Sequence, residues 1–130
     1  MVDKIESFRD IIAWQKAHEL VLLIYQITKS FPDSEKFGLI SQMRRAAVSV
    51  ACNIVEGFAR KKIKESLNFY NMAVASLEEL KYQILISRDL NLIEINVNSQ
   101  LVLLADEVGR TLHGWIHSQK INVAKKKENN

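Results

Sequence analysis

The chain has 130 residues, of which 48% are hydrophobic and 25% charged, and its 18 Lys and Arg against 15 Asp and Glu leave a formal net charge of +3. A chain of this length folds as one domain, and its apolar content excludes intrinsic disorder. The apolar runs are far shorter than the roughly 18 residues of a membrane-spanning helix, and residues 1–6 do not resemble a signal peptide, so we expect a cytoplasmic protein without membrane contact.

Apolar residues recur at helical spacing along the chain and almost nowhere alternate with a period of two, which predicts an all-α fold. The first expected helix spans about residues 10–29, with Asp10 as its N-cap, and the second about residues 38–61. The residues expected on the inward faces of these two helices are Ala13, Ala17, Leu20, Val21, Ile24 and Ile27, then Leu39, Met43, Ala47, Val50, Ile54 and Phe58.

The third expected helix spans about residues 64–88, and the fourth about residues 98–118. Their expected inward residues are Phe69, Ala73, Leu77, Leu80 and Ile84, then Leu101, Leu104, Ala105, Val108, Leu112, Trp115 and Ile116. Four helices of similar length joined by short loops predict an up-down-up-down antiparallel four-helix bundle over residues 1–119. Residues 120–130 are expected to form a basic, flexible C-terminal tail.

The second expected helix carries more apolar surface than one bundle can bury. Beside its inward face lies a second patch of small apolar residues, Val48, Ala51, Val55 and Ala59. We call three of them, Val48, Val55 and Ala59, the outer strip. A helix that is apolar over most of its girth usually has neighbours on two sides, so we expect the outer strip to form a subunit interface in a homo-oligomer. The alternative is that these are ordinary scattered surface residues.

Positive charge is concentrated at the C-terminal end. The last eleven residues hold Lys120 and the three C-terminal lysines, Lys125, Lys126 and Lys127, against only Glu128. The last eleven residues therefore carry a net charge of +3, which equals the net charge of the whole chain, so residues 1–119 are neutral overall. A bound polyanion would therefore have to use local clusters of basic side chains.

One such cluster follows the second expected helix and consists of Arg60, Lys61, Lys62 and Lys64, which we call the turn cluster. Four positive charges within five residues are a candidate nucleic-acid site, and the C-terminal lysines could add a flexible contact to phosphates. The alternative is that both clusters are simply solvated. Since no aromatic residue interrupts either run, recognition of a structured RNA by shape or backbone is favoured over base stacking.

Two adjacent arginines, Arg44 and Arg45, point about 100° apart on a helix and cannot serve the same surface. Each is a candidate for phosphate contact, because the guanidinium group suits bidentate pairing. We favour instead an ion pair of Arg45 with Glu56 or with a carboxylate of a neighbouring subunit. Glu56 and Arg60, four residues apart, are also expected to pair.

The sequence offers no recognisable catalytic arrangement. The lone Cys52 excludes an intrachain disulfide and a thiolate zinc site, and we expect it to be a small buried residue. His113 and His117 share one helical face, but they are more simply solvated histidines than half of a metal site. We therefore expect no enzyme, no catalytic or metal-binding residue, no cofactor and no small-molecule substrate.

Four segments in order carry a resemblance to a known family: residues 11–17 (IIAWQKA), 31–39 (FPDSEKFGL), 41–50 (SQMRRAAVSV) and 53–58 (NIVEGF). The likeness continues through residues 69–73 and 76–80. On these segments the chain resembles the bacterial four-helix-bundle proteins encoded in 23S rRNA intervening sequences, also labelled the S23 ribosomal protein family. The resemblance covers about residues 8–116 and implies a cytoplasmic homopentamer with no defined catalytic residues.

A more distant similarity joins the chain to the accessory variability proteins of diversity-generating retroelements, which are pentamers that bind nucleic acid and a reverse transcriptase. Two hypotheses follow. The first is an oligomer that binds structured RNA or DNA through the turn cluster and the C-terminal lysines. The second is a scaffold that presents helix faces to a protein partner such as a reverse transcriptase. Charge reversal at Lys61 and Lys62 distinguishes them, because only the first should lose its ligand.

Overall fold

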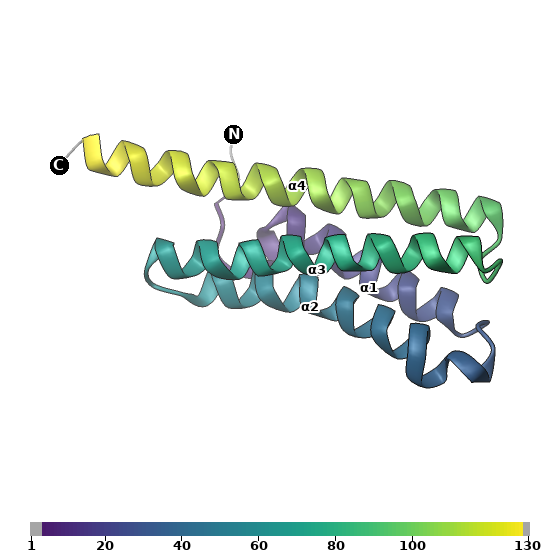
Figure 1. Cartoon of the computed structure of the whole chain (residues 1–130). Helices are drawn as coiled ribbons and strands as arrows, with labels where there is room; N and C mark the ends of the chain where they lie inside the picture. The colour runs from purple at the N-terminus through teal and green to yellow at the C-terminus, as the bar shows by residue number, and fades with distance from the viewer. Residues whose placement is uncertain (1–3, 129–130) are drawn as a thin grey trace.

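The computed structural model describes residues 4–128, and within them it contains four α-helices and no strand. The helices are α1 (Ile12–Thr28), α2 (Ser41–Ala59), α3 (Ile63–Asp89) and α4 (Ile95–Glu128). Each helix packs against its neighbours in sequence, and α1 also packs against α4, which closes the bundle (Figure 1). The predicted all-α, up-down-up-down four-helix bundle is confirmed.

The core follows the predicted stripes because side chains three or four positions apart lie on one face of a helix. Most of the expected inward residues are buried, among them Leu20, Ile54 and Leu112. A smaller group only packs against the edge of the core: Val21, Ile27, Leu39, Phe58, Leu104 and Trp115. Phe69 is not part of the core, and its partly exposed ring lies beneath the guanidinium group of Arg60. The largest buried side chain that the pattern missed is Tyr70, which is 2% exposed.

The prediction that Asp10 caps the first long helix is wrong. Asp10 ends a short 3-10 helix, Phe8–Asp10, and its carboxylate accepts hydrogen bonds from the backbone N–H groups of Glu6 (2.9 Å) and Ser7 (3.1 Å). The N-cap of α1 is Ile11, which has no capping side chain. A carboxylate three residues after a serine forms a capping box, so Asp10 caps the preceding turn instead.

The connection between α1 and α2 is longer than predicted. A 3-10 turn (Asp33–Glu35) and a π-helical turn (Lys36–Ile40) precede α2, and the carboxylate of Glu35 accepts the backbone N–H of Leu39 at 3.2 Å. Gly38 interrupts the helical geometry with φ −104° and ψ −113°. Regular α2 therefore begins three residues after the expected start.

The expected tail over residues 120–130 is wrong in its secondary structure. Helix α4 continues without interruption through Glu128, and residues 129–130 lie outside the described residues. The segment after Gly114 contains no glycine or proline, and its lysines lie where cations favour the C-terminal end of the helix dipole. As Figure 1 shows, α4 consequently extends past the turn between α2 and α3.

Candidate nucleic-acid interface

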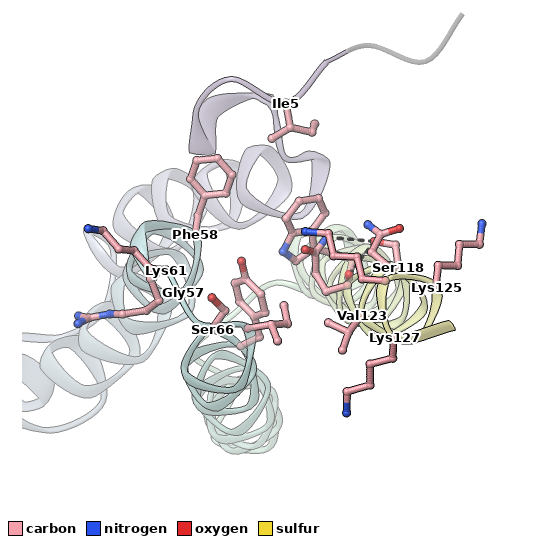
Figure 2. A pocket seen from close by; sticks show the side chains of 16 residues that line it. Ile5, Gly57, Phe58, Lys61, Ser66, Ser118, Val123, Lys125 and Lys127 are labelled. Atoms are coloured by element: carbon pink, nitrogen blue, oxygen red, sulfur yellow. Dashed lines mark hydrogen bonds between the residues drawn. The ribbon is translucent and has the colours of Figure 1, made fainter. Parts of the chain in front are cut away.

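A large pocket lies at the end of the bundle where α2 turns into α3, and we call it the end pocket (Figure 2). Its volume is about 870 Å³. The N-terminal segment, the end of α2, the start of α3 and the C-terminal part of α4 each contribute side chains to its lining. The end pocket therefore depends on the extension of α4 that the sequence pattern did not predict.

Basic side chains from two distant parts of the sequence line the end pocket. Arg60 and Lys61 of the turn cluster come from the α2–α3 connection, and all three C-terminal lysines come from the last turns of α4. In Figure 2 Lys61 lies on one side of the pocket, and Lys125 and Lys127 on the other. The fold thus unites two clusters that the sequence presents separately.

Not every member of the turn cluster faces the end pocket. Lys62 and Lys64 are exposed at the start of α3 but do not line it. Arg60 lines the pocket but is held by its neighbours, since it pairs with the carboxylate of Glu56 at 3.0 Å and lies 4.5 Å from the ring centroid of Phe69. The predicted pair of Glu56 and Arg60 is confirmed.

The lysines around the end pocket keep their charge available. Lys61 and the C-terminal lysines form no ion pair with any other side chain that the structure describes. Unpaired ammonium groups attract polyanions more strongly than neutralised ones, because no carboxylate has to be displaced. Lys61 and the C-terminal lysines therefore bring to the end pocket positive charge that no described side chain neutralises.

Aromatic side chains also line the end pocket. Tyr70 of α3 and Trp115 of α4 both line it, with ring centroids 6.2 Å apart and planes at 75°, and Phe58 of α2 adds a third ring. No aromatic residue interrupts the basic runs of the sequence, but the fold supplies these rings from other parts of the chain. Tyr70 had a detectable signal, since it lies three residues before Ala73 on the same buried stripe.

Burial shapes the chemistry of the aromatic pair. It raises the pKa of the Tyr70 hydroxyl above its ordinary value, and the neighbouring indole of Trp115 offsets this only in part. The Trp115 Nε1 atom is buried and forms no hydrogen bond with the described residues that meets normal geometry. A phenol and an indole are both uncharged at neutral pH, so ionic contact in the end pocket comes from its basic side chains.

The two adjacent arginines serve different purposes, and both lie away from the end pocket. Arg44 donates from Nε to the Thr28 hydroxyl (2.9 Å) and from Nη2 to the Tyr25 carbonyl oxygen (3.3 Å), with its guanidinium 4.6 Å from the Tyr25 ring centroid. Arg45 is exposed, and the expected pair with Glu56 is not formed, because the two residues lie about 16 Å apart along α2. Glu56 pairs with Arg60 instead. Arg44 thus holds α2 against α1.

The outer strip lies on the outward side of α2. Val48 and Val55 are partly buried and Ala59 is exposed, whereas Ala51 of the same apolar patch is buried within the bundle. Cys52 lies between the two valines in sequence, and it is exposed, so the expectation that it is buried is wrong. Val48 also lines a second, open pocket of about 490 Å³ together with Phe37, which is 87% exposed.

His113 and His117 are exposed on α4. Residues 4–128 contain no group of three or more His, Cys, Asp or Glu side chains placed to hold a metal ion. Within the same residues, none of the helices is both long enough and apolar enough to cross a membrane.

Comparison with known proteins agrees with the fold. The family model described as the 23S rRNA-intervening sequence protein matches residues 9–114. The structure is similar to a crystal structure from Bacteroides thetaiotaomicron, of a protein with unknown function from the S23 ribosomal protein family. The two structures match with a TM-score of 0.75 and 20% sequence identity, and the match covers 82% of this chain and 96% of the other chain. No curated protein matches the chain. The α4 side of the end pocket, from Trp115 onward, lies beyond the matched residues.

Proposed function

The chain belongs to the 23S rRNA-intervening sequence protein family, and from this premise we propose that it is a non-enzymatic protein that binds structured RNA or DNA at the end pocket. One observation carries the proposal. Basic side chains from the α2–α3 connection and from the end of α4, more than 60 positions apart in sequence, line the same pocket. Lysines gathered in this way contact several phosphates of one strand at once, and each contact adds to the affinity by releasing counterions.

We also propose that the protein is a homo-oligomer assembled through the outer strip, and a pentamer is the state that the family resemblance implies. Support comes from Val48, Val55 and Ala59, which leave apolar surface on the outward side of α2. Repetition of the end pocket around a closed ring would multiply the contacts with one long nucleic acid. No cofactor or small-molecule substrate is part of this proposal.

The test is fluorescence anisotropy with a labelled RNA stem-loop across a salt series. We expect binding that weakens steeply with salt, because about 0.9 counterions are released for each neutralised phosphate of a duplex. In the variant with Lys125→Gln and Lys127→Gln, the slope of log K against log salt should fall by up to about 2. The matched control, Lys29→Gln with Lys36→Gln, removes the same charge from exposed positions at the other end of the bundle.

The alternative is the protein-interaction scaffold. The observation that favours it is the second pocket, where the exposed ring of Phe37 lies beside Tyr25 and Val48. If the protein does not bind the stem-loop at low salt, the nucleic-acid proposal is contradicted and the scaffold proposal remains. Charge reversal at Lys61 and Lys62 that abolishes RNA binding would support the nucleic-acid proposal.

A further inference from the structure

The end pocket has a layered chemistry that phosphate contact alone does not use. Its lysines lie at the rim, the polar side chains of Ser118, Gln119 and Asn122 come from the α4 wall, and aromatic rings and aliphatic side chains line the rest. A paired duplex presents its phosphates on a convex surface and keeps its bases stacked inside. Such a surface would contact the rim but would leave the interior of the pocket empty.

An unpaired nucleotide matches all three layers. Its base has an apolar π-face that stacks on aromatic side chains, and its edge carries donors and acceptors that amide and hydroxyl side chains recognise. Its flanking phosphates are anionic, as the lysine rim requires. At about 870 Å³ the end pocket is within the size range of pockets that hold small ligands, roughly 300–1,000 Å³.

We infer that the end pocket takes the base of one unpaired nucleotide, such as a bulge in a structured RNA, while the lysine rim contacts the phosphates on either side. This inference rests on the proposed function and adds the specificity that backbone contact lacks. Phe58 and Trp115 are partly exposed and supply the surface against which the base packs. Gln119 and Asn122 line the pocket from α4, and their side-chain amides supply donors and acceptors for the polar edge of the base.

Three RNA duplexes of equal length distinguish this inference from simple charge attraction. The first is fully paired, the second carries one bulged adenosine, and the third carries an abasic residue at the bulge. The abasic duplex keeps the phosphates and the bend of the bulge but lacks the base. We expect the bulged adenosine to bind about tenfold more tightly than the abasic bulge, which is typical of one base stacked on an aromatic side chain.

The outcomes separate the two proposals. Equal affinity for all three duplexes overturns the base pocket and leaves charge-driven RNA binding intact. Absence of binding to every duplex at low salt overturns the proposed function and the base pocket together. Tighter binding of the bulged and abasic duplexes alike, relative to the paired one, also overturns the base pocket, because shape alone then explains it.

Substitutions and the fluorescence of Trp115 test whether the base binds in the end pocket. Asn122→Trp places a bulky side chain in the lining and should abolish the preference for the bulged adenosine over the abasic bulge. Gln100→Trp, at an exposed position nearer the opposite end of α4, should keep the preference.

In a Trp14→Phe background, Trp115 is the only tryptophan, and its fluorescence should change with the bulged adenosine but not with the abasic bulge. An unchanged Trp115 signal at saturation overturns the inference.

Discussion

The ring of Tyr70 lies directly against the backbone of Gly57. A Cβ atom at position 57 would come within 2.7 Å of Cδ1 of that ring, and closer still to Cε1. Gly57 is in the last turns of α2 and Tyr70 in the second turn of α3, so the absence of a side chain lets the helices approach beside the end pocket. Both residues line that pocket, and its shape therefore depends on this contact.

The first prediction follows from this contact. Gly57→Ala should destabilise the protein by about 1–2 kcal/mol, because overpacking costs roughly 1–3 kcal/mol and exceeds the gain in helix propensity. Tyr70 is 2% exposed and has little room to move. Gly114→Ala is the control, since a Cβ there meets nothing within 4 Å and should stabilise α4 by about 0.5–1 kcal/mol. Urea denaturation measures both, and two variants of equal stability would contradict the prediction.

The second prediction concerns the adjacent arginines. Arg44→Ala should lower the free energy of unfolding by roughly 1–3 kcal/mol, because it removes charged hydrogen bonds to Thr28 and Tyr25 and the contact with the Tyr25 ring. Arg45→Ala should stay within about 0.5 kcal/mol of the parent, since its side chain is exposed. Thermal denaturation compares them, and a larger loss for Arg45→Ala would show that the roles are reversed.

The third prediction is alkaline destabilisation through Tyr70. Because burial raises its pKa, the folded protein keeps the hydroxyl proton at a pH where the unfolded chain has released it. The unfolded state then binds fewer protons, so the free energy of unfolding falls as pH rises above about 10. Lys16 contributes in the same direction, because its contact with the Glu107 carboxylate raises its pKa.

Denaturation midpoints between pH 8 and about 11 test this prediction. Tyr70→Phe should make the alkaline decline shallower, and the remaining slope should reflect Lys16 and other groups. Tyr82→Phe, at a position 63% exposed, should leave the decline as in the parent. If Tyr70→Phe left the alkaline decline in stability unchanged, the decline would be due entirely to groups other than Tyr70.

The fourth prediction concerns assembly. Ala59→Glu adds a charge to the outer strip at an exposed position, so it costs the single bundle little but should dissociate an oligomer built on this surface. Light scattering coupled to size exclusion should show a lower mass than for the parent at micromolar concentration. Ala75→Glu, at an exposed position of α3, is the matched control and should keep the parent mass. A parent protein that is monomeric under these conditions would refute the interface.

The fold class was predictable because it depends on local pattern. Ala13, Leu20 and Ile24 lie on one face wherever the segment is helical, so spacing alone predicts which residues are buried. The same holds for the pair of Glu56 and Arg60, which are neighbours on any helix. The ends of the elements were less predictable, since Asp10 suits either of two adjacent turns and the competing hydrogen bonds decide between them.

The candidate site was predictable only in parts. The basic residues could be found from sequence, but their meeting depends on the direction in which α3 returns and on how far α4 continues, which are properties of the packed bundle. The same packing brings Tyr70 and Trp115 into the lining that Lys61 and the C-terminal lysines share. Charge and periodicity are properties of short segments and remain visible in sequence, whereas a pocket arises from residues of different helices and exists only once those helices have packed.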